Sequence, residues 1–91
     1  MIIHDYNKNQ VLAQQLLNAG CYLSFGKAIQ FPELAKVVAN IARDRFFLES
    51  DDAPDSIESI YKGVADLRNI SIEALSLQLQ KNTLSVFKIP V

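Results

Sequence analysis

The stretch RFFLESDDAP, residues 45–54, runs from bulky apolar side chains directly into three carboxylates, Glu49, Asp51 and Asp52, and then stops at a proline. Its apolar half is typical of a buried strand. Carboxylates without a partner are costly to bury, so acidic side chains stay in solvent or meet a cation. We therefore expect the three acids just past the end of a strand, where water or a cation can reach them.

Two other short apolar runs resemble the first half of this stretch. They are MIIH (residues 1–4) and CYLSF (21–25), and with RFFLE (45–49) they predict three strands. Helical spacing lies between and after them, over residues 10–20, 32–42, 56–68 and 72–87. The short segment GKAIQ (26–30) is predicted to be a loop.

Helix boundaries can be predicted from single residues. Gly20 fits the left-handed position after a helix end, and Pro32 fits a first helical turn, where its missing N–H costs nothing. Asp55 is expected to cap the helix that follows it, with Glu58 reaching back as in a capping box. Ser71 is expected to cap the last helix.

The apolar positions of each helix predict which face packs on the sheet. Side chains three or four positions apart share one face of a helix. The predicted faces are Val11, Leu12, Gln15 and Leu16 in the first helix, Ile57, Ile60, Tyr61, Val64 and Leu67 in the third, and Leu75, Leu79 and Phe87 in the last.

The alternation of strands and helices predicts an α/β fold of three consecutive parallel βα units joined by right-handed crossovers. The strands should be neighbours in chain order. Functional groups in such sheets gather beyond the carboxyl ends of the strands. His4 ends the first strand and Asp51 follows the third, so both should lie at the same rim, where they could hold a divalent cation.

Composition excludes some functions and leaves others open. Nine basic and ten acidic residues give a net charge of −1. Proteins that bind nucleic acid through a basic surface have an excess of positive charge, and this sequence has none. The sequence has no apolar run long enough to span a membrane, and its first ten residues, MIIHDYNKNQ, have neither the basic n-region nor the long apolar h-region of a signal peptide. The single cysteine, Cys21, cannot form an internal disulfide. Together these features favour a cytoplasmic protein.

Each candidate residue also has a structural interpretation. A lone histidine at a strand end is often only hydrogen-bonded or solvated, and Asp51 could serve as part of a helix cap. Cys21 is most simply interpreted as a small buried apolar residue, and Tyr22 and Phe25 are most simply interpreted as core residues. The sequence shows no glycine-rich phosphate loop, paired CxxC motif or Ser/His/Asp constellation.

Three segments occur in the order HDYNKNQVLAQQLLNAGCYLSFG (residues 4–26), RFFLESDDAP (45–54) and GVADLRNISIEALSLQLQKNTLSVF (63–87). In this order they resemble the C-terminal portion of the TatD family of metal-dependent deoxyribonucleases. The family has a histidine, a polar loop and a helix, then a Tyr-x-Ser-Phe strand, an apolar strand ending in Glu-Thr-Asp, and a last helix with Asn before an aromatic. The matching residues here are His4, the segment 22–25, Glu49 to Asp51, and Asn82 to Phe87. The resemblance covers nearly the whole chain.

The resemblance implies the last part of a TIM-barrel hydrolase of the amidohydrolase type, with a two-metal site at the carboxyl rim. It makes His4 a metal ligand, and Asp51 both a metal ligand and the residue that orients or deprotonates the attacking water. It makes Glu49 a partner of a ligand rather than a ligand. The implied cofactors are divalent metal ions, Mg²⁺ first, with Mn²⁺ or Zn²⁺ as alternatives, and the implied substrate is DNA. The loop after His4 departs from the family, because Asp5, Tyr6, Asn7 and Lys8 replace its usual residues.

The resemblance also predicts what residues 1–91 lack. The family's other metal ligands precede this region, so we expect one partial domain, the C-terminal segment of the barrel, that is inactive by itself. The alternative is a non-catalytic truncated module that acts through oligomerisation or a partner chain. Because three strands taken from a closed barrel would expose an apolar inner face, the chain is expected to self-associate as a homo-oligomer.

Overall fold

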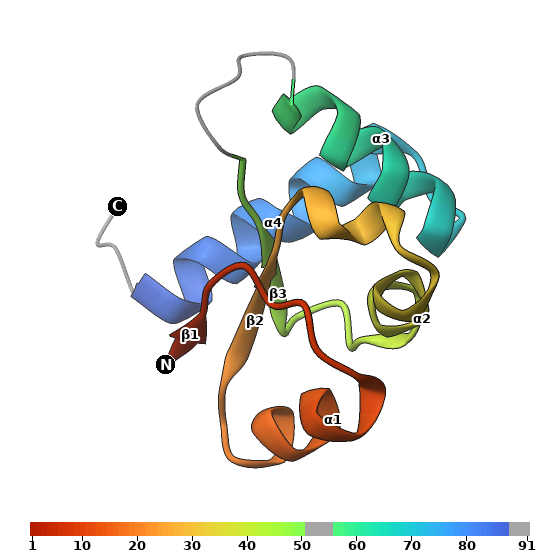
Figure 1. The fold of residues 1–91 in the computed structure, drawn as a ribbon. Coiled ribbons are helices and arrows are strands. Elements are labelled where there is room, and N and C mark those ends of the chain that lie inside the picture. Colours follow the sequence, from red (N-terminus) through yellow and green to blue (C-terminus); the bar gives the residue numbers. More distant parts are fainter. Residues whose placement is uncertain (51–55, 88–91) are drawn as a thin grey trace.

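The computed structural model describes residues 1–50 and 56–87 (Figure 1). Three short strands form one sheet, four α-helices pack around it, and a 3₁₀ helix, η1, follows the second strand. In chain order the elements are β1 (Ile2–Ile3), α1 (Gln10–Asn18), β2 (Tyr22–Phe25), η1 (Lys27–Gln30), α2 (Pro32–Asn40), β3 (Phe46–Leu48), α3 (Ser56–Arg68) and α4 (Ile72–Phe87).

The sheet confirms the predicted topology. Its order is β1-β2-β3 with both pairs parallel, so β2 is the central strand. Ile3 pairs with Leu23, which in turn pairs with Phe46. Figure 1 shows α1 and α2 in the crossovers and α4 crossing behind β2 and β3. The segment GKAIQ was predicted as a loop, and this was wrong for its last four residues, which form η1.

The core lies between the sheet and the helices. Registered residues of adjacent strands share a face of a sheet, and Leu23, Phe25 and Phe46 on one such face are fully buried. Helix side chains close over them, namely Ala13, Leu34, Val37, Val38, Ile60, Val64, Ala65, Leu75 and Leu79. Phe25 and Phe46 lie with their ring centroids 6.3 Å apart at the centre.

Two arginines bind backbone carbonyls near helix ends, Arg45 from the residue before β3 and Arg68 from the end of α3. Arg45 donates from Nη2 to Leu17 O and Cys21 O, at 3.2 and 2.6 Å, where α1 ends. Arg68 donates from Nη1 to Val38 O and Ile41 O, at 2.9 and 2.7 Å, where α2 ends. Arg68 thus supplies a donor for Val38 O in the last turn of α2, and Arg45 adds a donor to Leu17 O, which also accepts from Gly20 N at 3.0 Å.

The predicted helix ends are confirmed where the structure describes them. Gly20 has a φ of +90° after α1, Pro32 begins α2, and the Ser71 hydroxyl accepts from Ala74 N at 3.1 Å. Asn9 caps α1 by accepting from Leu12 N at 2.9 Å. The predicted cap Asp55 lies outside the described residues.

The predicted helix faces were partly wrong. Val11, Leu12 and Gln15 are exposed. Leu16 packs against the core as predicted, together with Ala13 and Leu17, which were not predicted. The sequence of α1 holds two overlapping sets with helical spacing, and the small Ala13 lets the helix lie close to the sheet. Further exposed side chains among those predicted to face the core are Leu67 and Phe87. Ile60, Val64, Leu75 and Leu79 are buried as predicted.

The second face of the sheet differs from the expected exposed apolar surface. Ile2, Tyr22 and Phe47 on this face are only half-buried rather than exposed. The Tyr22 and Phe47 rings lie 5.9 Å apart, and Phe87 of α4 lies 6.4 Å from Phe47. The Arg45 guanidinium sits 4.8 Å from the Tyr22 ring centroid. These mutual contacts remove part of the face from water.

No helix within residues 1–50 and 56–87 is long and apolar enough to span a membrane.

Candidate functional site

The carboxyl ends of β1 and β3 bring His4 and Glu49 together. His4 follows β1 directly and Glu49 follows β3, with β2 between the two strands. His4 Nδ1 lies 3.1 Å from Glu49 Oε2. Residues 45 positions apart in sequence therefore meet at one rim, because parallel strands end at the same edge of the sheet.

This contact sets the orientation of the imidazole ring. With Nδ1 donating to the carboxylate, Nε2 carries the lone pair and is the nitrogen that can bind a ligand. The His4 side chain is 75% exposed, so a ligand can reach Nε2, whereas the Glu49 side chain is 31% exposed and better held. A carboxylate on one ring nitrogen and a metal on the other is a recurrent arrangement in metal sites.

Gly26 makes room for the two loops to approach each other. A Cβ at this position would lie 3.3 Å from Asp5 Oδ1, which is a tight contact, and 3.5 Å from Glu49 O, which is an ordinary one. Glu49 N also donates to Phe25 O at 2.9 Å, which continues the β2–β3 pairing to the rim. A small hollow of about 120 Å³ results, lined by Asp5, Gly26, Lys27, Glu49 and Ser50.

Tyr6 anchors the loop that carries His4. Its N–H donates to Ser24 O at 2.9 Å, its ring packs edge-on against Phe25, and its hydroxyl donates to Asn9 O at 2.6 Å. Burial raises the pKa of the Tyr6 phenol, and a hydrogen bond with the backbone of Ala13 opposes the rise. The loop is thus pinned two residues beyond His4. Asp5, between them, takes a left-handed φ of +50°.

The described residues supply only part of a metal-ligand set. Asp51, the predicted catalytic residue and ligand, lies outside them. Within residues 1–50 and 56–87, no three His, Cys, Asp or Glu side chains are grouped to hold an ion. Divalent cations need several protein ligands each. His4, oriented by Glu49, could supply one ligand, and other residues would have to supply the rest.

Sequence reasoning missed two contributors to this rim, Gly26 and Tyr6. The glycine that ends β2 was a usable signal, because a glycine at a strand end often marks a close approach of backbones. The anchoring by Tyr6 had no comparable signal, since it depends on the packing of its ring on Phe25.

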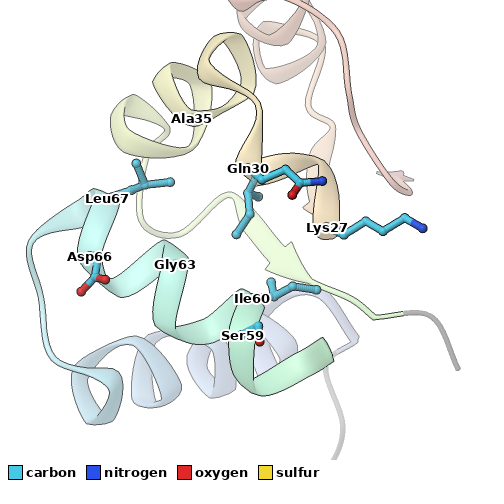
Figure 2. Close-up of a pocket in the computed structure, with 9 residues that line it drawn as sticks. Lys27, Gln30, Ala35, Ser59, Ile60, Gly63, Asp66 and Leu67 are labelled. Carbon is cyan, nitrogen blue, oxygen red and sulfur yellow. The ribbon is translucent and has the colours of Figure 1, made fainter. Parts of the chain in front are cut away.

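Two larger hollows lie between helices. One of about 570 Å³ lies between η1, α2 and α3 and is lined by residues including Ile29, Ile60 and Leu67. In Figure 2 its two charged residues, Lys27 and Asp66, stand far apart, with small and apolar residues between them. Another, of about 610 Å³, lies between α3 and α4. Its lining residues are Ile57, Glu58, Tyr61, Lys62, Ile72 and Ser76.

Parallel βα units that carry a histidine and a carboxylate beyond their strand ends are characteristic of the α/β-barrel class of enzymes. Comparison with known proteins agrees with this class. The family model for TatD-related DNases matches residues 1–88. The chain therefore belongs to the TatD family.

Relatives of the chain are considerably longer than 91 residues. An uncharacterized metal-dependent hydrolase of Buchnera aphidicola subsp. Baizongia pistaciae is 29% identical over 107 aligned residues, which cover 98% of this chain and 40% of that protein. The chain thus spans about two fifths of the curated relative that it matches.

Two crystal structures share the fold. A TatD family hydrolase from Entamoeba histolytica superposes with a TM-score of 0.83 at 16% identity, over 92% of this chain and 40% of that one. YJJV, a TatD homologue from Escherichia coli K12, superposes with a TM-score of 0.87 at 18% identity, over 98% and 40%. These matches confirm the predicted fold class, part of a TIM-barrel hydrolase.

Proposed function

We propose that residues 1–91 provide the C-terminal segment of the barrel in a divalent-metal-dependent hydrolase that cleaves phosphodiester bonds of DNA. The observation that carries this proposal is the His4–Glu49 contact at the carboxyl rim, 3.1 Å long and open to solvent on the side of His4. Membership of the TatD family supports the reaction class.

In this proposal three residues divide the work. His4 binds a metal ion through Nε2, because Nδ1 is turned toward Glu49. Glu49 holds the ring in place and stabilises positive charge on it. Asp51 is a ligand of the other ion and orients the attacking water or takes its proton. Bound divalent ions would polarise the phosphoryl group and lower the pKa of that water.

The ions we propose are Mg²⁺ first, with Mn²⁺ and Zn²⁺ as alternatives. Carboxylate and water ligands suit Mg²⁺ and Mn²⁺, whereas an imidazole ligand favours Zn²⁺. Residues 1–91 alone would bind any of them weakly, because the ligand set is incomplete. We expect the isolated chain to have no nuclease activity.

The test uses a protein that contains this chain together with the rest of the barrel. Nuclease activity on DNA is measured with Mg²⁺ or Mn²⁺ for the parent and for Asp51→Asn, with Asp44→Asn as a control that removes an exposed carboxylate before β3, at the opposite end of the sheet. We expect kcat to fall by a factor of about 100 or more for Asp51→Asn, as for loss of a general base, and to stay unchanged for Asp44→Asn. Wild-type activity in Asp51→Asn would disprove the role of Asp51.

Glu49→Gln tests the positioning role separately. Gln keeps the size of the side chain but loses the charge that favours a metal-bound imidazole. We expect the metal concentration at half-maximal activity to rise about 10-fold or more, the lower end for loss of such a partner, with a smaller change in KM for DNA. If the metal dependence is unchanged, Glu49 does not act through His4.

A further inference from the structure

A fourth hollow lies at the opposite end of the sheet from His4, where β3 begins. It has a volume of about 190 Å³ and lies among β3, the end of α3 and the first turns of α4. Its lining residues are Arg43, Phe46, Arg68, Ile70, Ala74, Leu75 and Gln78. Two of the nine basic residues of the chain therefore border one small hollow, and no acidic residue lines it.

Arg68 is held rigidly at this hollow. Nη1 donates to Val38 O and Ile41 O, and the guanidinium carbon lies 5.0 Å from the centroid of the Phe46 ring. These contacts fix the plane of the group, while Nε and Nη2 have no hydrogen-bond partner in the described part of the chain. A fixed fork with free N–H groups is suited to bind an oxyanion.

The positive charge of Arg68 is not neutralised inside the protein. The groups that accept its hydrogen bonds are uncharged carbonyls, and within residues 1–50 and 56–87 the one ion pair is that of His4 with Glu49. Burial lowers the pKa of the Arg68 guanidinium, which shows that its charge has lost hydration. A partly desolvated cation without a counter-ion attracts an anion more strongly than a solvated one.

Arg43 provides a second cation at the same place. Its carbonyl accepts from Asn82 Nδ2 at 2.9 Å, which fixes its backbone, whereas its exposed side chain has no partner among the described residues. The volume, about 190 Å³, is roughly six times the ~30 Å³ occupied by a water molecule, and this leaves room for a tetrahedral oxyanion with some hydration.

We propose that this hollow binds a phosphate group, with Arg68 as the fixed donor and Arg43 as the second, adjustable cation. The group could be inorganic phosphate or the terminal phosphate of a nucleotide, because both present the same oxygens. The site does not depend on the proposed nuclease function, since it lies at the amino end of β3 and shares no residue with the rim.

The test is a titration of the 91-residue chain followed by ¹H–¹⁵N correlation spectra that include the arginine Nε–H signals. One arm uses inorganic phosphate and the other thymidine 5′-monophosphate. We expect saturable shifts of Arg68 Nε–H and of the backbone amides of Ala74 and Leu75. Equal affinities would show that the phosphate group alone is recognised, and tighter binding of the nucleotide at the same signals would show added nucleoside contacts.

Arg43→Gln is the deciding variant, with Lys8→Gln as its matched control. Both remove one positive charge from an exposed side chain, but Lys8 precedes α1 and is not among the residues that line the hollow. Loss of a charged hydrogen bond should weaken phosphate binding about 10-fold in Arg43→Gln, and Lys8→Gln should bind as the wild type does. Equal weakening in both variants, or no saturable shift with either ligand, would overturn the proposal. Unchanged unfolding curves check that both variants are folded.

Discussion

Asn82 is the polar residue on which the attachment of α4 to the sheet depends most. Its side chain is 1% exposed, and Nδ2 donates to Arg43 O and Phe46 O, each at 2.9 Å. Oδ1 accepts from Gln78 Nε2, also at 2.9 Å. One side chain therefore satisfies two carbonyls that flank the start of β3, and its own acceptor is satisfied within α4.

The cost of Asn82→Ala follows from these contacts. Each lost hydrogen bond removes about 1 kcal/mol, and a carbonyl left buried without a partner adds about 1–3 kcal/mol. The bond to Phe46 O is buried and that to Arg43 O is partly exposed, so the larger penalty applies once. The three lost hydrogen bonds and one such penalty give an expected loss of about 4–6 kcal/mol, a large fraction of the roughly 5–15 kcal/mol that stabilises a domain.

The sharper variant is Asn82→Asp, which keeps the shape but replaces both donors with a carboxylate oxygen. At neutral pH that oxygen would face two carbonyl oxygens, so Asn82→Asp should be at least as destabilising as Asn82→Ala. Gln78→Ala is the matched control in the same helix, since it removes only the partly exposed bond to Oδ1 and should cost about 1 kcal/mol.

Urea unfolding followed by circular dichroism measures all three variants. The predicted order of stability is wild type, then Gln78→Ala, then Asn82→Ala, with Asn82→Asp lowest or equal to it. The reasoning is refuted if the free energy of unfolding of Asn82→Asp lies within about 1 kcal/mol of the wild-type value, because the two N–H donors of Asn82 would then contribute little to stability.

Three further predictions concern pH, backbone strain and assembly. Burial raises the Tyr6 pKa above 10.0 in the folded state. The contribution of the neutral phenol to stability is therefore complete below pH 10 and is lost as the pH rises through the folded-state pKa. Above pH 10 the urea midpoint should fall less steeply with pH in Tyr6→Phe than in the wild type, and parallel curves would contradict this. Gly20→Ala should cost about 1–2 kcal/mol from backbone strain alone, since nothing lies within 4 Å of the added Cβ, and Gly20→Asn should cost less in the same unfolding assay. The isolated chain should self-associate through strand edges or through the half-buried sheet face that includes Phe47. Sedimentation equilibrium at micromolar concentration measures this, and a folded, strictly monomeric species would contradict the prediction.

Local sequence was sufficient for the features that depend on neighbouring residues. The three strands, the end of α1 at Gly20, the start of α2 at Pro32 and the cap at Ser71 were predicted and are confirmed. A left-handed φ, a missing N–H or a capping hydroxyl acts within a few positions along the chain. The parallel order of the strands followed as well, because right-handed crossovers leave few alternatives.

The candidate site was predictable only in outline. Strand ends predicted that His4 and Asp51 lie at one rim, and the resemblance made Glu49 a partner of a ligand. The 3.1 Å contact between His4 and Glu49 involves a loop that Tyr6 pins two residues beyond His4. Such contacts join residues far apart in the sequence, and a pattern of residue types carries no distance. The metal roles of His4 and Asp51 stay predictions.

The sequence by itself determined where strands and helices form, because backbone conformation, capping and apolar spacing act over a few residues. Only the tertiary structure decided which face of α1 is buried, because both overlapping sets have helical spacing; Ala13 is buried, whereas Val11 and Leu12 are exposed. It alone also decided that the polar Asn82 is buried, because the carbonyls at the start of β3 need donors that α4 brings from 36 and 39 positions away.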